Sequence, residues 1–464
     1  MLAEEQPWRI FWENRAAVVE ALKHGHCDGI LPAARGFFDH FAQFLDGHNI
    51  LLHLEDFPDH RQRRSIPAFF FCHSLLYKPL LKIERLNHLP DVLFRSPQVM
   101  RQLGFNARQI EAGFYENAGH KPFDIEALCD FFATTTDDDY VAHQQRMLKQ
   151  MVVEWPQVWA SGKWVMDSMI FATAPGAHDL AAGRYKVCVL ALWRDDVLWP
   201  MLWQFGDEHA SDHTLGQSVI AAAVELLGER MKHLLIDRGF LDGEWIANLY
   251  RRGVRVTVGL KENMEAFADL LGLSQLPDVV WEEVAPPHNH APVKPKRQVT
   301  ADTLMSWESC QVPLVGCLIR DTYPAQVVYQ ARVTTAEQAT ASEIYQDSAE
   351  RWDIEELFMT LTRYWHMDDL PPSRRGVALA QVHFGILAFT LLQLFYHEQA
   401  AHDAGVSPPR GLMPERELAV YAGSYFALLR PSELMEIIFD NLKAWQATES
   451  HWRKALRLCE GASP

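Results

Sequence analysis

Three short runs in the middle of the chain, 163–172, 186–194 and 197–205, are its clearest strand candidates. The turn-rich segment APGAHDLAAGR separates the first two runs and the tight RDD separates the last two, so we expect an antiparallel meander. Pro200 lies inside the third run, and a proline cannot donate a hydrogen bond to a neighbouring strand. The third strand is therefore predicted to lie at an edge of the sheet.

The segment after this meander alternates between helical and strand patterns. It predicts a helix over 214–231, a strand over 233–237, a helix over 242–252 and a strand over 254–260. A strand, a helix and a second strand in this order imply a right-handed parallel crossover. Three antiparallel strands followed by helix, strand, helix and strand are the layout of a ribonuclease H-like α/β core with a mixed five-stranded sheet.

The flanking regions differ in character from this core. Residues 1–160 are mostly helical by pattern and are predicted to form a separate N-terminal domain. The core is predicted over 161–262 and 326–400, and the short β-prone pieces of 263–325 predict a β-rich insertion between its two parts. Residues 401–464 are predicted to form a helical C-terminal region. A length of 464 residues fits two to four domains.

The charge balance excludes one broad class of function. The chain has 43 Lys and Arg against 60 Asp and Glu, a net charge of −17, which argues against a protein that coats nucleic acid over its whole surface. Any nucleic acid is therefore bound locally. With 48% hydrophobic and 22% charged residues, most of the chain should be ordered.

The cysteines and the apolar segments indicate a cytoplasmic protein. The seven cysteines are scattered and form no CxxC pair, so a disulfide framework or a zinc ribbon is not indicated. The N-terminus MLAEEQPWRIFWENR has acids and no apolar signal-peptide core. The uncharged run 376–396 approaches membrane-spanning length but contains polar residues such as Gln381 and His383, so it predicts a buried helix.

Two aspartates interrupt predicted strands. Asp167 in KWVMDSMIF shares a strand face with Val165 and Met169, and Asp237 ends the apolar strand of HLLIDRGF. A bare carboxylate in such surroundings costs about 2–7 kcal/mol or more unless it has a partner. A buried arginine or a helix terminus is as good an explanation for Asp167 as a ligand site. For Asp237 a ligand site is favoured, because such sites form at the carboxyl ends of parallel strands.

One glutamate completes a possible acid site. Glu355 flanks the apolar stripe of the helix containing ERWDIEELF, and Arg351 lies one turn earlier on the same surface. Taken alone, this pair is explained by an exposed ion pair of small energetic value. If Asp167, Asp237 and Glu355 meet in the fold, their oxygens make a site for a divalent metal.

The strings DRGF and RWDIEELF, the second introduced by RVTTAEQATASEI, resemble the DDE transposases of bacterial insertion sequences. That group carries a β-rich insertion before the final Glu and a Tyr/Arg/Glu/Lys signature. The likeness spans Lys163 to Tyr396. It implies a ribonuclease H-like catalytic core in which Asp167 and Asp237 lie on adjacent strands and Glu355 approaches from a helix.

The resemblance implies a DNA transposase that cleaves the ends of its element and transfers the freed 3′-OH into target DNA. It implies two Mg²⁺ ions, with Mn²⁺ as a substitute: Asp167 bridges both, and Asp237 and Glu355 hold one each. The implied partners are double-stranded DNA, both element ends and target, and a second copy of the chain in a homodimer. The N-terminal domain is the candidate for binding DNA ends, and the implied location is the bacterial cytoplasm at the nucleoid, without a membrane.

Five residues are expected to contact DNA; they are Arg238, Lys261, Trp307, Arg351 and Arg363. Arg351 should contact a phosphate or orient Glu355, and Lys261 follows the last strand of the first core segment. By resemblance, Trp307 in the insertion would stack on an extruded base, whereas the residue taken alone is better explained by a place in the hydrophobic core.

Two positions of the family signature differ in this chain. Ser348 stands at the Tyr position and Thr362 at the Lys position, while Tyr345 and Arg363 lie nearby in a different helical phase. Two alternative functions therefore remain: a catalytically impaired, domesticated DNA-binding relative, and a ribonuclease H-like nuclease without strand transfer.

Overall fold

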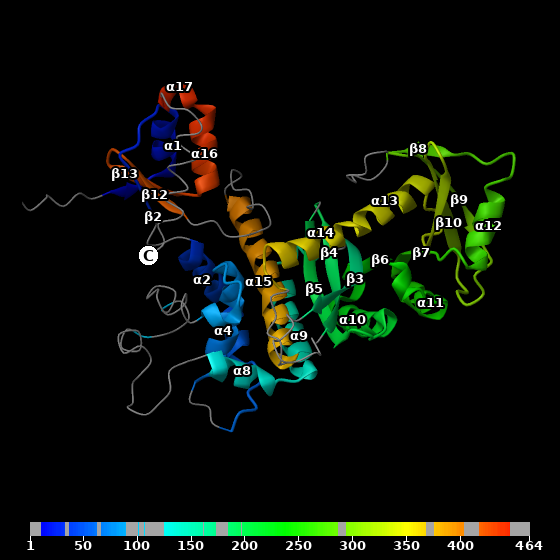
Figure 1. Cartoon of the computed structure of the whole chain (residues 1–464), viewed down its shortest axis with the longest axis horizontal. Coiled ribbons are helices and arrows are strands. Elements are labelled where there is room, and N and C mark those ends of the chain that lie inside the picture. Colours follow the sequence, from blue (N-terminus) through cyan, green and yellow to red (C-terminus); the bar gives the residue numbers. More distant parts are fainter. Residues whose placement is uncertain are drawn as a thin grey trace, which may run out of the picture. The chain divides into compact units, whose positions relative to one another are not determined.

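The chain forms two compact units, residues 48–397 and residues 1–47 together with 398–464 (Figure 1). The computed structural model describes residues 11–32, 37–62, 66–89, 101, 106, 125–160, 162–172, 184–195, 197–285, 294–367, 375–402 and 417–445.

The larger unit is built on one nine-stranded sheet with the order β5-β4-β3-β6-β7-β11-β10-β9-β8. Its strands are β3 (Gly162–Ala172), β4 (Arg184–Arg194), β5 (Val197–Asp207), β6 (Met231–Ile236), β7 (Arg255–Gly259), β8 (Glu282–Val284), β9 (Lys296–Leu304), β10 (Leu314–Thr322) and β11 (Val327–Thr334). Strands β3, β4 and β5 pair antiparallel, and β6 and β7 run parallel to β3. The mixed sheet with helices on it is consistent with a ribonuclease H-like fold, and β5 with its Pro200 lies at the edge, as predicted.

The observed sheet has nine strands, whereas five were predicted. The predicted insertion 263–325 contains α12 (Glu265–Leu273), β8, β9 and β10. Strand β11 pairs antiparallel with β7, and β10, β9 and β8 continue from it. The free hydrogen-bonding edge of β7 thus finds a partner, and the inserted strands extend the core sheet instead of forming a sheet of their own.

Helices cover both faces of the first strands of the sheet. One face packs on α10 (Asp212–Leu227), whose Gly216 lies against Met166. The other face packs on α13 (Ala341–Arg351) and α14 (Asp353–Arg363). Neighbouring residues of a strand point to opposite faces, so Met166 points towards α10 and Asp167 towards α13 and α14. The remaining crossover helix is α11 (Gly243–Arg251), capped by the Asp242 side chain.

A helical layer stands beside strand β5. It contains α3 (Ile50–Glu55), α4 (Ala68–Leu80), α8 (Ile125–Ala133), α9 (Asp137–Glu154) and α15 (Arg375–His402). Among the described residues, only α15 has a stretch long and apolar enough to cross a membrane, and this stretch, within 375–399, is entirely buried in the fold. Thr390 and Gln393 of α15 donate to the backbone oxygens of Pro200 and Leu198. Two polar residues of the apolar run 376–396 thus bind the edge strand.

Close packing of α15 on α8 depends on Gly376. A Cβ atom at this position would lie 2.1 Å from the backbone oxygen of Phe132, which cannot move aside easily. We expect Gly376→Ala to destabilise the protein by about 3 kcal/mol, the upper end for overpacking, in urea unfolding. Gly272→Ala is the control, because nothing lies within 4 Å of its added Cβ and alanine favours the helix. Equal stabilities of the two variants would contradict the prediction.

Buried histidines join α9 to α15. His143 Nδ1 lies 2.8 Å from His383 Nε2, and both side chains are buried. Burial lowers the pKa of His383 to about 3 and likewise that of His73 in α4. Burial, and then the neighbouring His383, lowers the pKa of His143 well below its usual range.

These histidines predict a loss of stability in acid. Because the folded state keeps them neutral, the unfolded chain takes up protons first as the pH falls below about 6.5. Stability should be constant above that pH and fall between about 6.5 and 3, by about 2 kcal/mol per histidine at pH 5. Urea unfolding at pH 7.5 and pH 5 measures the difference, and His383→Gln should reduce it. An unchanged pH dependence in that variant would exclude His383 as a cause.

The smaller unit contains a four-stranded sheet with the order β1-β13-β12-β2. Its elements are β1 (Trp12–Glu13), α1 (Arg15–Lys23), β2 (Gly29–Pro32), α2 (Phe37–Gly47), β12 (Leu418–Ala422), β13 (Tyr425–Leu429), α16 (Pro431–Asp440) and α17 (Leu442–Trp445). Val18 and Leu22 of α1 share a core with Val420 and Leu429 of the hairpin β12–β13.

This division corrects the predicted domains. Residues 48–160 belong to the same unit as the large sheet, and residues 1–47 fold with the C-terminal segment. The predicted all-helical region 401–464 contains β12 and β13, joined at Gly423 with φ 61°. These two five-residue strands were missed because they are short and stand between helical patterns; the rest of this region, 403–416 and 446–464, lies outside the described residues.

Candidate active site

Strand register brings Asp167 and Asp237 side by side. Strands β3 and β6 are parallel, and Met166 pairs with Ile236. The next residue of each strand is the aspartate, so both carboxylates stand in one row at the carboxyl end of β6. The predicted adjacency of the two acids follows from this pairing.

The helix pair α13–α14 brings Glu355 and Arg351 to the same place. Thr340 and Glu343 form a capping box that starts α13, and Arg351 ends it. Arg351 Nη1 lies 2.9 Å from Asp167 Oδ2, and Arg351 Nη2 lies 3.6 Å from Glu355 Oε1. Both explanations of Asp167 therefore apply: it has a buried arginine partner and it lies near the other acids.

The charges of the site are coupled. Burial raises the pKa of Asp167 to about 6, with Arg351 opposing the shift and with repulsion from Asp237 and Glu355 adding to it. Burial raises the pKa of Glu355 as well, and Asp237 contributes again by repulsion. The three carboxylates thus act on one another, and a nearby cation would relieve their repulsion.

Arg351 lies between two of the acids that were predicted to hold a metal ion. In the described part of the chain, no three His, Cys, Asp or Glu side chains converge closely enough to hold a metal. The guanidinium of Arg351 instead bridges Asp167 and Glu355. Asp237 has no ion pair or side-chain hydrogen bond among the described residues. Three carboxylates are nevertheless the donor set that suits Mg²⁺ or Mn²⁺, so the chemistry of these residues fits such an ion.

Three of the predicted DNA-contacting residues are exposed. Arg238 is exposed in the turn that follows Asp237, and Lys261 is exposed just past β7. Arg363 is exposed at the end of α14. Trp307 is half-buried in the β9–β10 loop, which also carries Ser309, and a Cβ on Gly243 would lie 2.3 Å from Ser309 Oγ. This loop therefore packs where α11 begins, six residues after Asp237.

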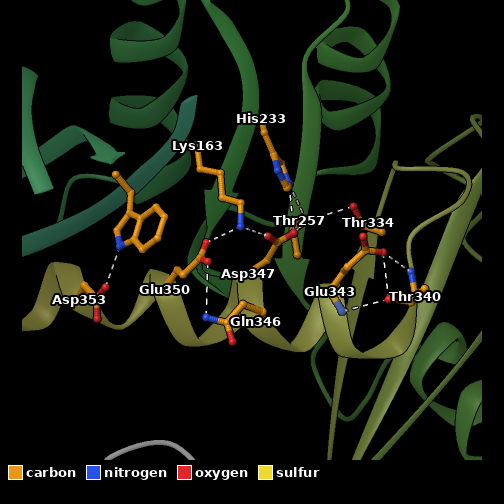
Figure 2. A network of polar contacts seen from close by, with 11 residues as sticks. Lys163, His233, Thr257, Thr334, Thr340, Glu343, Gln346, Asp347, Glu350 and Asp353 are labelled. Atoms are coloured by element: carbon orange, nitrogen blue, oxygen red, sulfur yellow. Dashed lines mark hydrogen bonds and ion pairs between the residues drawn. The ribbon is translucent and has the colours of Figure 1, made fainter. Parts of the chain in front are cut away.

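Sequence reasoning missed a group of charges that holds α13 on the sheet (Figure 2). Lys163 Nζ lies 3.0 Å from Asp347 Oδ1 and 2.6 Å from Glu350 Oε2. His233 Nε2 lies 3.2 Å from Asp347 Oδ2. We call these four residues the helix-docking cluster. One signal was present in the sequence: Lys163 lies four residues before Asp167, on the same face of its strand.

The two departures from the family signature have different surroundings. Ser348 Oγ accepts a hydrogen bond from Arg332 Nε at 2.9 Å, and Thr362 bonds to the backbone of its own helix. Tyr345 donates to the Ala285 oxygen and accepts from Arg297, so it does not take the place of the signature tyrosine.

A mixed sheet with acids and arginines in one row at the carboxyl end of its parallel strands defines a candidate enzyme of phosphoryl transfer. Residues 184–391 match the family model described as the transposase DDE domain. Over this part the chain is thus similar to the DDE transposase family. The match includes Asp237, Arg351 and Glu355, whereas Asp167 precedes it, so the place of Asp167 in the site depends on the structure.

Curated proteins and solved structures give no further indication of the function of this chain. No curated protein matches the chain. The crystal structure of the NurA nuclease from Sulfolobus solfataricus is similar over 53% of this chain and 86% of that chain, at 9% identity and a TM-score of 0.21. That score is too low to bear on fold or function.

Proposed function

We propose that this chain is an insertion-sequence transposase that cuts the ends of its element and joins them to target DNA. The observation that supports it most is the row of Asp167 and Asp237 facing Arg351 and Glu355, with the last three residues inside the match to the transposase DDE domain. In the first reaction a water oxygen bonds to phosphorus and the bond to the 3′ oxygen breaks, which frees a 3′-OH. In the second, that hydroxyl attacks a phosphodiester of the target and displaces its 3′ oxygen.

Asp167, Asp237 and Glu355 are the residues that would hold the divalent ions, Mg²⁺ or Mn²⁺, with two ions as the family chemistry suggests. When bound, these ions stabilise the charge that develops on the attacking and leaving oxygens. Asp237, which has no partner among the described side chains, is available for this role. With an ion bound, Asp167 and Glu355 would no longer need the guanidinium of Arg351, and Arg351 would be able to bind a DNA phosphate.

The surroundings of the row supply the contacts to double-stranded DNA. Arg238, Lys261 and Arg363 are exposed cations that bind the backbone, and Trp307 stacks on an extruded base. We assign the reading of element ends to the N-terminal region, now divided between the two units. Pairing of two ends requires a homodimer, and the protein acts at the nucleoid in the cytoplasm.

A cleavage and joining assay tests this function. The substrate is a duplex of the DNA that flanks the gene for this chain, incubated with a target plasmid and Mg²⁺ or Mn²⁺. Cleavage at defined ends and joined product, both lost with a chelator, are the expected results. Cleavage without joining would identify a nuclease instead.

One observation favours the impaired relative as the second candidate. Arg351 pairs with Asp167 and bridges to Glu355, while Ser348 and Thr362 replace two signature residues. A chain that binds the flanking duplex tightly but does not cut it with either metal would be this DNA-binding relative.

A further inference from the structure

A third arginine, Arg332 of β11, belongs to the same row as the acids. Ile236 of β6 pairs with Val258 of β7, so Gly259 stands beside Asp237. Gly259 in turn pairs with Arg332. Paired residues of adjacent strands point to the same face of a sheet, so the side chains of Asp167, Asp237 and Arg332 share the face that α13 covers.

The glycine in this row leaves space for the guanidinium. A Cβ atom at Gly259 would lie 3.4 Å from Arg332 Nη1 and 3.8 Å from Arg238 Cβ. The guanidinium of Arg332 therefore extends over Gly259, in the direction of Asp237. A larger residue at position 259 would crowd the two arginines.

Arg332 is held by neutral groups only. Its nitrogens donate to Ser348 Oγ at 2.9 Å, to the Ala331 oxygen at 3.0 Å and to Gln330 Oε1 at 3.3 Å. Among the described residues no carboxylate lies within ion-pair distance of it. Its charge therefore remains without a direct counterion.

The surrounding charges also leave Arg332 in need of an anion. Burial lowers its pKa to about 10, and Arg351 and Arg238 contribute by repulsion, with Asp237 opposing. At neutral pH it still carries its proton. Arg351 and Arg238 thus both repel Arg332 beside the acid site, and this arrangement favours a negatively charged ligand.

We propose that Arg332 binds the phosphate of DNA next to the cleavage point. This inference rests on the proposed function. Arg332 is then a residue that touches substrate, and Ser348 is a positioning residue that orients its guanidinium. The rival explanation is that Arg332 only ties β11 to α13 through Ser348.

A thermodynamic cycle between the protein and single phosphates separates these explanations. The probe is the flanking duplex, made as a series in which one phosphate at a time near the cleavage position is an uncharged methylphosphonate. Binding is measured with Ca²⁺ to prevent cleavage. We expect one methylphosphonate to weaken binding by the wild type about tenfold to a hundredfold, and Arg332→Met to weaken binding of the normal duplex by a similar factor.

Binding of the Arg332→Met variant to the methylphosphonate duplex distinguishes the two explanations. Arg332→Met should bind that methylphosphonate duplex no more weakly than the normal one, because the lost charge has already removed the contact. Arg332→Lys, which keeps the charge, should retain part of the coupling between the side chain and the phosphate. This variant replaces Arg332→Met in the test if the Met variant folds poorly. Arg320→Met is the control, because Arg320 lies over the Trp281 ring at 3.9 Å and pairs with Tyr329, on the opposite face from Arg332.

Two results would overturn the proposal in distinguishable ways. If both arginine variants are as sensitive to every methylphosphonate as the wild type, Arg332 is structural and the transposase function stands. If the wild type itself neither binds nor cuts the flanking duplex, the proposed function fails and the inference with it.

Discussion

Replacing Asp167 with Asn should abolish cleavage of element-end DNA while leaving the fold intact. The variant keeps the shape of the side chain but removes the charge that a divalent ion needs, and metal stabilisation of the transition state is worth several kcal/mol. The cleavage rate should therefore fall by about a thousandfold or more. A single-turnover assay with Mn²⁺ measures it, and thermal unfolding shows whether the variant is folded.

The matched control is Asp195→Asn. Asp195 has an 86% exposed side chain in the turn between β4 and β5, and its positive φ of 53° suits asparagine. This variant should cleave as the wild type does. Full activity of Asp167→Asn would show that Asp167 is not part of the catalytic site. Its only role would then be the ion pair with Arg351.

Lys163→Met should cause the largest loss of stability among single changes at the sheet surface. Asp347 and Glu350 have side chains only 10% and 7% exposed, and Lys163 forms an ion pair with each of them. Burial opposes the charge of Lys163, but the two carboxylates prevail and raise its pKa. Its removal leaves two buried acids without their cation, which costs about 3 kcal/mol, the lower end for a broken buried pair because Lys163 is partly exposed.

The pH dependence of this variant identifies the cause. Burial already raises the pKa of Glu350, and without Lys163 it should rise further. The folded variant then binds protons more readily than its unfolded chain, so its deficit relative to the wild type should shrink as the pH falls towards 4.5. Lys232→Met, at an exposed position of β6, should change stability by less than about 0.5 kcal/mol. A deficit that is constant with pH would assign the loss to packing.

The core of the sheet was predictable because its signals are local. The alternation of the three meander strands and the proline in β5 lie within single elements, and each gives a strand or its edge position directly. The row of Asp167 and Asp237 was predicted from the family resemblance, because the strand of Asp167 taken alone left a buried arginine as an equal explanation. Arg351 was predicted to contact a phosphate or to orient Glu355, whereas its shorter contact is with Asp167.

The positions of other residues in the site depend on how distant segments pair, and the sequence does not specify this pairing. Lys163 meets Asp347 and Glu350 only because α13 crosses the first strands of the sheet. Arg332 interrupts the otherwise uncharged VVYQARVT, the same kind of signal that singled out Asp167, but its place beside Gly259 needs the β7–β11 register. The hairpin of β12 and β13 was missed for a different reason, since its strands are too short to outweigh the helical patterns around them.

The pairing of β11 with Gly259 has a consequence for how this chain tolerates change. A shift of one residue would turn the guanidinium to the opposite side and bring Ala331 or Val333 into its position. The site thus depends on the register in which β11 pairs with β7. The length of the segment between these two strands matters less. Lengthening the β9–β10 loop should leave the positions of the three acids unchanged. Deleting a single residue within β11 should change which side chains of this strand face the ligand.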